Sequence, residues 1–125
     1  MIRALERKAD RLVQEATARL WDACLVCGER NGVMGHHIVH RSQCRGALYG
    51  LRHDLCNIMP LCVACHVPFA HGQPKEFDAW FAKTYPAWQK GLMERRAGML
   101  AAASCCRTLE YLEETCTRLR FGKWP

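Results

Sequence analysis

The chain has 125 residues, half of them hydrophobic, and its 18 Lys and Arg against 12 Asp and Glu give a formal net charge of +6. This composition predicts one globular domain and excludes a disordered or collagen-like chain. No uncharged apolar run approaches the ~20 residues that cross a bilayer, and the N-terminus is too charged for a secretory signal. We therefore expect a soluble, cytoplasmic protein that has no membrane partner.

The first predicted element is an amphipathic helix over residues 3–22. Apolar residues recur there at helical spacing, and charged residues occupy most of the other face. The apolar positions are Leu5, Leu12, Val13, Ala16 and Leu20. A scaffold helix is the favoured interpretation, because its acids nearly balance its bases; a DNA-contacting helix is the alternative.

The next segment, from Cys24 to Gly72, lacks helical periodicity and is rich in glycine. Short β-prone stretches at 33–39 and 57–61 predict two strands with a loop between them. Two strands alone are marginally stable, so the segment needs a further constraint such as a bound metal.

The rest of the chain is predicted to be helical from Pro74 onward. A helix starting at Pro74 carries an aromatic core stripe and closes at the Tyr85–Pro86 step. We expect the following helix to be interrupted near Gly91 or Gly98. A last helix carries a stripe of Leu109, Leu112, Cys116 and Leu119, which serves either intramolecular packing or a dimer seam.

Nine cysteines, an odd number, favour metal binding over a disulfide scaffold in a chain with no signal peptide. Two CxxC pairs, Cys24 with Cys27 and Cys62 with Cys65, predict a structural site with tetrahedral Zn²⁺. Four thiolates and one Zn²⁺ would lower the net charge from +6 to about +4. Four unrelated buried thiols are the alternative; a redox CxxC is disfavoured because no βαβ pattern surrounds either pair.

The insert between the two pairs carries the residues that suggest catalysis. His36 and His37 are adjacent on a predicted strand, so one ring can bind a metal while the other faces a substrate. Asn57 lies in the second predicted strand, and His66, directly after Cys65, can reach back to the same metal.

These residues together resemble a known family. HHIV at 36–39, NIMPLC around Asn57 and CVACH at 62–66, framed by CLVCG at 24–28, are similar to the HNH endonucleases. Residues 52–72 and 75–86 resemble in particular the small HNH proteins of phages and prophages. The likeness covers about 24–86. It implies a ββα-metal core stapled by zinc. With the predicted N-terminal helix at 3–22 and a C-terminal helical extension over 87–121, both outside the likeness, the expected fold is α+β, mostly helical, in a single domain, 1–125.

The resemblance also implies a role for each motif residue. His37 would be the general base, His36 and His66 ligands of a catalytic divalent metal, and Asn57 the residue that holds His37 in position. His71 is the candidate third ligand, but it lies five residues after His66. An α-helix would turn it away, so ligation needs a non-helical turn or a water bridge.

Three further predictions concern basic residues near the site. Arg41, Arg45 and Arg52, in or beside the inter-strand loop, are candidate DNA phosphate contacts. We expect His40 to contact phosphate or solvent, and His53 to be structural.

The predicted function is a metal-dependent HNH endonuclease that nicks or cleaves DNA in a bacterial or phage-infected cell with low sequence specificity. The catalytic ion would be Mg²⁺, Mn²⁺, Ni²⁺ or Zn²⁺. A homodimer, or a partner in a phage or prophage DNA-processing complex, would support double-strand cleavage. A catalytically silent zinc-stapled nucleic-acid-binding or adaptor module is the alternative, and an assembly factor acting through its C-terminal stripe is a third hypothesis.

Overall fold

The computed structural model describes residues 1–122, and its centre is a two-stranded antiparallel sheet. Strand β1 (Met34–His37) pairs with β2 (Ile58–Leu61), and His36 lies opposite Met59. Both strands fall within the two predicted β-prone stretches. The loop between them contains three short 3₁₀-helices and returns the chain to the sheet.

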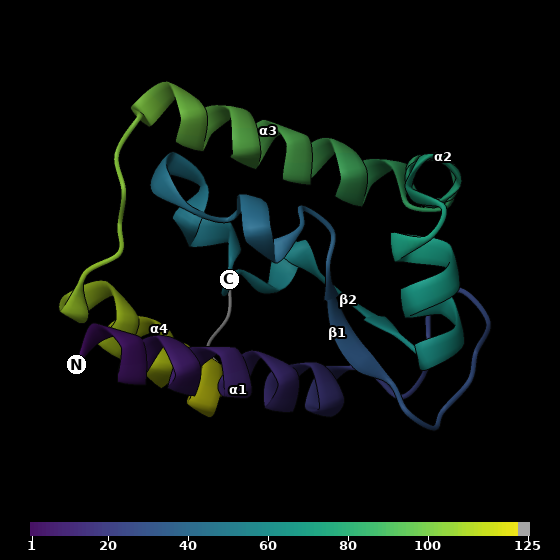
Figure 1. Ribbon diagram of the computed structural model, residues 1–125, viewed down its shortest axis with the longest axis horizontal. Helices are drawn as coiled ribbons and strands as arrows, with labels where there is room; N and C mark the ends of the chain where they lie inside the picture. Colours follow the sequence, from purple (N-terminus) through teal and green to yellow (C-terminus); the bar gives the residue numbers. More distant parts are fainter. Residues whose placement is uncertain (123–125) are drawn as a thin grey trace.

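Four α-helices in the described part of the chain surround this sheet. They are α1 (Ile2–Leu20), α2 (Pro74–Thr84), α3 (Pro86–Ala102) and α4 (Leu109–Phe121). Helices α1 and α4 lie side by side on one side of the sheet, and α3 covers the loop segment on the other (Figure 1). The predicted α+β, mostly helical fold class is confirmed. Among the described helices, none has the length and apolar character needed to cross a membrane.

The buried face of α1 matches the predicted stripe at its centre. Leu12, Val13 and Ala16 are buried, whereas Leu20, at the last turn, is 62% exposed. Ala9 lies on the same face and is fully buried. This face packs against α4 and against both strands, which is the scaffold role that the sequence favoured.

A polar side chain of α1 completes the hydrogen bonding of β1. Gly35 lies opposite Pro60, which has no N–H to donate. The Gln14 side chain accepts from Gly35 N at 2.8 Å and donates to Gly35 O at 3.2 Å. A Cβ at position 35 would lie 2.7 Å from Ile58 Cγ2, so this close approach requires glycine.

Helices α2 and α3 meet at the Tyr85–Pro86 step. Phe77 and Phe81 of α2 are buried, which confirms the predicted aromatic core stripe. Helix α3 runs without interruption through Gly91 and Gly98, so the predicted break is wrong. One glycine costs a helix only about 1 kcal/mol, and burial of apolar side chains on α3 offsets that cost.

Helix α4 places its apolar stripe against α1. Leu112, Cys116 and Leu119 are buried there, and Leu109 at the N-terminal end is 36% exposed. The buried positions belong to the core of this chain, which favours intramolecular packing over a dimer seam.

Replacement of Leu112 by Ala tests this packing. We expect Leu112→Ala to lower the free energy of unfolding by about 2–5 kcal/mol, because a cavity is left between α1 and α4. Leu109→Ala, on the same helix but partly exposed, is the matched control and should cost less than about 1 kcal/mol. Urea unfolding at two protein concentrations measures both. A wild-type midpoint that rises with concentration would instead support the dimer seam.

Candidate active site

The two CxxC pairs converge at one point. Cys24, Cys27, Cys62 and Cys65 bring their sulfur atoms within 4.8 Å of one another. Cys27 Sγ lies 3.5 Å from Cys62 Sγ, close to the ~3.8 Å that a tetrahedral ion with ~2.3 Å metal–sulfur bonds imposes. Gly28, with a φ of 82°, closes the turn after the first pair. This donor set and its spacing fit a structural Zn²⁺.

A second cluster is formed by histidines from β1 and from the segment after Cys65. Among the described residues, His36, His66 and His71 bring ring nitrogens within 4.8 Å of one another. His66 Nε2 and His71 Nε2 are 3.0 Å apart, about the separation of two imidazoles ~2.1 Å from one ion at a right angle. Three imidazole nitrogens at this spacing fit a divalent transition-metal ion.

The buried ring of His36 supplies independent support for a ligand at this point. His36 is 1% exposed, and its Nε2 atom has no hydrogen-bond partner among the described residues. Burial, followed by the neighbouring His66 and His71, lowers the pKa of His36 to about 3. The ring is therefore neutral at pH 7, which is the form that binds a metal.

The backbone after Cys65 explains how His71 reaches the cluster. Residues Cys65–His71 form a π-helix, in which a residue and the fifth after it lie on the same face. Gly72 N accordingly donates to Val67 O at 2.9 Å. Pro68 cannot donate the hydrogen bond that an α-helical turn requires at its position. The geometry of an α-helix, from which we expected His71 to turn away, does not apply here.

His37 lies in a different environment from its neighbour His36. Its Nε2 atom lies 2.8 Å from Arg52 O. A carbonyl oxygen can only accept, so Nε2 carries the proton and Nδ1 keeps its lone pair. Burial lowers the pKa of His37, although the bond to Arg52 O opposes this. A neutral ring with an unprotonated Nδ1 can accept a proton.

The hydrogen bonds of Asn57 go to the backbone on either side of the loop between the strands. Asn57 is fully buried and ends a 3₁₀-helix, Leu55–Asn57. Its Oδ1 accepts from Val39 N at 2.7 Å, and its Nδ2 donates to Val39 O and to Leu51 O, both at 3.0 Å. Asn57 therefore joins the exit of β1 to the loop that presents the carbonyl of Arg52.

The candidate phosphate-binding arginines differ in their availability. The Arg52 side chain is 15% exposed and pairs with Asp10 and Glu6 of α1, so the prediction that it contacts DNA is corrected. Arg41 is 56% exposed and lies 3.2 Å from Asp10 Oδ2. Arg45 is exposed at the surface of the loop. Arg41 and Arg45 remain accessible to a polyanion.

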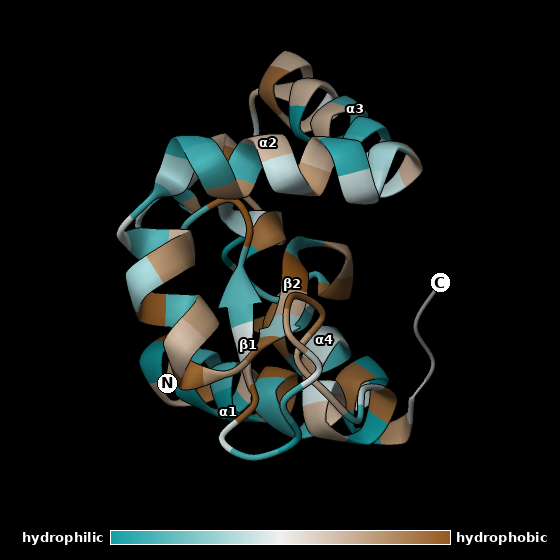
Figure 2. Ribbon diagram, turned by 90° about the vertical axis from the view of Figure 1, so that its right-hand side faces the viewer, coloured by the Kyte–Doolittle hydropathy of each residue, from teal (hydrophilic) through white to brown (hydrophobic). Residues whose placement is uncertain are grey.

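His40 and His53 are placed differently by the fold. His53 is fully buried, and its Nε2 atom lies 2.8 Å from Asp10 Oδ1, as a structural histidine would. His40 lies beside the metal-type cluster, with its ring centroid 5.1 Å from that of His71. Figure 2 shows a hydrophilic end to β1, whereas the surrounding helices are of mixed hydropathy.

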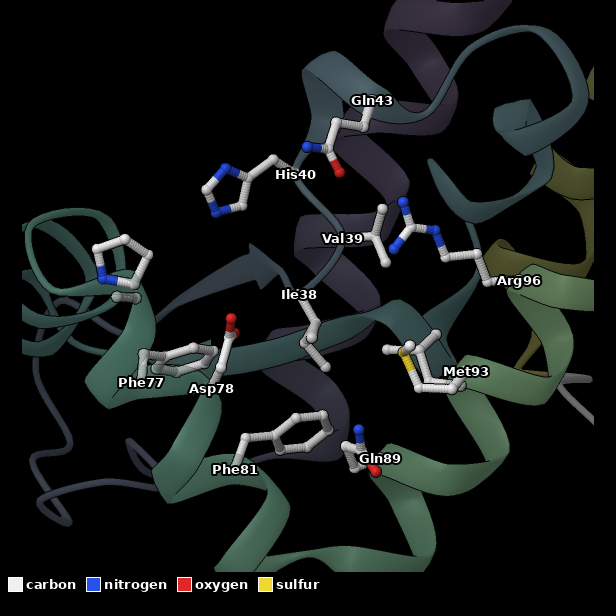
Figure 3. Close-up of a pocket in the computed structure, with 13 residues that line it drawn as sticks. Ile38, Val39, His40, Gln43, Phe77, Asp78, Phe81, Gln89, Met93 and Arg96 are labelled. Carbon is white, nitrogen blue, oxygen red and sulfur yellow. The ribbon is translucent and has the colours of Figure 1, made fainter.

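A groove of about 410 Å³ adjoins the histidine cluster. His40 and Gln43 lie along one side of it, and residues of α2 and α3 along the other (Figure 3). Arg96 extends from α3 toward Val39 on the floor of the groove. The groove thus places one further cation, which the sequence did not single out, near the candidate site.

Asp10 lies beside the candidate site, and the sequence did not single it out. It lies on the charged side of α1, and no local pattern distinguishes it from the other acids of this helix. Only the fold brings it to Arg52 and His53, 42 and 43 residues further along the chain.

Comparison with known proteins gives one match. The model of the HNH endonuclease family matches residues 24–68. No curated protein and no solved structure matches the chain. The matched segment contains both CxxC pairs, His36, His37, Asn57 and His66, and it leaves out α1, His71 and the C-terminal helices. Residues 24–68 are thus similar to the HNH endonuclease family, as the paired histidines and the two CxxC pairs indicated.

Proposed function

We propose that this protein is a metal-dependent endonuclease that hydrolyses DNA phosphodiester bonds with low sequence specificity. The observation that carries the proposal is that the two adjacent histidines at the end of β1 lie in different surroundings. His36 faces a cluster of imidazoles suited to a metal, whereas His37 is held by Arg52 O with its Nδ1 atom unprotonated. The two histidines are adjacent residues of β1, so both proposed functions lie at the same end of one strand.

In this proposal His37 acts as the general base. Its Nδ1 atom takes a proton from a water molecule as the water oxygen attacks phosphorus. The bond from phosphorus to the 3′-oxygen breaks, and the leaving oxygen takes a proton from solvent. The Nε2 hydrogen bond to Arg52 O fixes the tautomer and stabilises the positive charge that the ring gains.

His36, His66 and His71 would hold the divalent ion. A bound ion supplies positive charge beside the phosphate oxygens and the leaving 3′-oxygen. Water and substrate oxygens would complete its coordination, because the protein cluster offers three ring nitrogens. Imidazole ligands suit Zn²⁺ and Ni²⁺, and Mn²⁺ and Mg²⁺ are further candidates for activity.

DNA is the proposed substrate because accessible cations lie beside the site. Arg41 and Arg45 are exposed on the loop after β1, and Arg96 lines the adjoining groove. The net charge of +6 favours a polyanionic partner. Contacts of this kind go to phosphates and carry little sequence information.

We also propose that α1 and the C-terminal helices belong to one nuclease domain. Helix α1 contacts both strands and α4, and α3 packs on the loop between the strands. A catalytically silent nucleic-acid-binding module remains the second candidate function. The presence of His37, Asn57 and His66 together favours the enzyme.

Plasmid cleavage tests the proposed activity. We expect the wild type to nick supercoiled DNA with Mg²⁺, Mn²⁺ or Ni²⁺ and not in EDTA. His37→Ala should lower the rate by about 10²–10⁴-fold, because the general base is lost. Zinc content and unfolding midpoint of the variant should equal those of the wild type. Equal rates for the two proteins would support the silent binding module.

The contribution of the π-helix to metal binding can be measured separately. We expect His71→Ala to weaken Ni²⁺ binding at the histidine cluster by at least about tenfold in calorimetric titration. His40→Ala, whose ring adjoins that of His71 but lies outside the ligand set, is the matched control. Equal losses of affinity in the two variants would contradict the assignment of His71.

The four-cysteine site is expected to hold one tightly bound Zn²⁺ per chain. Cys27→Ser should remove this ion and lower the thermal midpoint by about 10 °C or more, since ~1 kcal/mol corresponds to about 4 °C in a domain of this size. Cys105→Ser is the control, because both cysteines are exposed but Cys105 lies outside the cluster. Elemental analysis after dialysis against a chelator gives the zinc content. Retention of zinc by Cys27→Ser would contradict the site.

A further inference from the structure

Helix α1 lies outside the segment that matches the HNH family, yet it contributes charged groups to the loop behind His37. Arg52 donates to Asp10 through two nitrogens, Nε to Oδ1 at 3.0 Å and Nη2 to Oδ2 at 2.7 Å. His53 Nε2 lies 2.8 Å from Asp10 Oδ1. The Arg52 and Asp10 side chains are only 15% and 20% exposed. A two-point, partly buried pair of this kind fixes both position and orientation.

The same residue, Arg52, contacts the proposed general base through its backbone. Its carbonyl oxygen accepts the hydrogen bond from His37 Nε2 at 2.8 Å. The preceding carbonyl, Leu51 O, is held by Asn57, and Arg52 N donates to Tyr49 O at 3.0 Å. The peptide units on either side of the Arg52 Cα atom are therefore anchored from the core, and the Arg52 side chain is anchored from α1.

We propose that Asp10 is a positioning residue that orients His37 through Arg52. This inference rests on the proposed function, in which His37 is the general base. Asp10 touches neither substrate nor metal in this scheme. It holds the Arg52 side chain, and through it the carbonyl that selects the tautomer of His37. The catalytic site of this protein then extends beyond the family match into the N-terminal helix.

The charge on Asp10 persists under the conditions in which the enzyme would work. Burial raises its pKa, but hydrogen bonds from His53 and Arg52, together with the positive charge of Arg52, outweigh this and lower the pKa below the usual value. Asp10 also lies 3.2 Å from the exposed Arg41. Loss of Asp10 would therefore free Arg41, a candidate phosphate contact, and should not weaken DNA binding.

Steady-state cleavage by Asp10→Ala and Asp10→Asn tests the proposal. We expect kcat to fall about 10–100-fold in Asp10→Ala, as when an outer partner of an active-site group is removed. Asp10→Asn keeps one acceptor oxygen and should lose less. KM should not rise in either variant, because the substrate contacts remain.

Two control variants separate positioning from general destabilisation. Arg107→Gln removes an ion pair that Arg107 makes with Glu6 of the same helix. Leu119→Ala weakens the packing of α4 on α1 without touching Arg52. Both should keep kcat within about twofold of the wild type. A fall in kcat for Leu119→Ala as large as that for Asp10→Ala would overturn the proposal.

Nuclear magnetic resonance of ¹⁵N-labelled histidine gives a readout that does not depend on activity. At a pH where the rings are neutral, wild-type His37 should show the single tautomer protonated at Nε2, assigned by comparison with His37→Ala. Asp10→Ala should show a mixture of tautomers. An unchanged tautomer with unchanged kcat overturns the proposal. If Asp10→Ala shows the mixture of tautomers but the wild type has no nuclease activity, the positioning link is supported and only the proposed function is rejected.

Discussion

A ribbon of two four-residue strands buries too little surface to be stable by itself in water. Contacts from the rest of the structure therefore hold the two strands in place. The four-cysteine cluster fixes the chain before β1 and after β2. Gln14 of α1 holds the middle of β1, and Asn57 ties its exit to the loop. The directions of His36 and His37 thus depend on groups from four separate parts of the chain.

Apolar and polar contacts of α1 contribute differently to its attachment. Its apolar face packs on α4 and Ile58, which gives binding energy without direction. Its polar residues, Gln14 and Asp10, each make two or more hydrogen bonds to specific groups beside the site. Buried polar groups of this kind cost free energy when left unpaired, so they determine a single position for the helix.

The sequence predicted the elements whose signals are local. The amphipathic period of α1, the Tyr85–Pro86 step after α2 and the stripe of α4 each depend on residues within one element. The two predicted strands were also found, because each is a short β-prone stretch in a segment that lacks helical periodicity. The predicted break in α3 failed, because a single glycine is a weak signal and the side chains that stabilise the helix contact distant segments.

For the candidate site, the sequence by itself determined the chemical groups: four thiolates in two CxxC pairs, a pair of adjacent histidines, and a histidine directly after the second pair. Their type and spacing suffice, because ligand chemistry is a property of side chains. Only the tertiary structure decided that His71 joins the cluster, that Asn57 bonds to the loop, and that the Arg52 side chain pairs with Asp10. Each of these outcomes depends on a backbone conformation or on a partner from another part of the chain. A local sequence pattern predicts neither the conformation nor the partner.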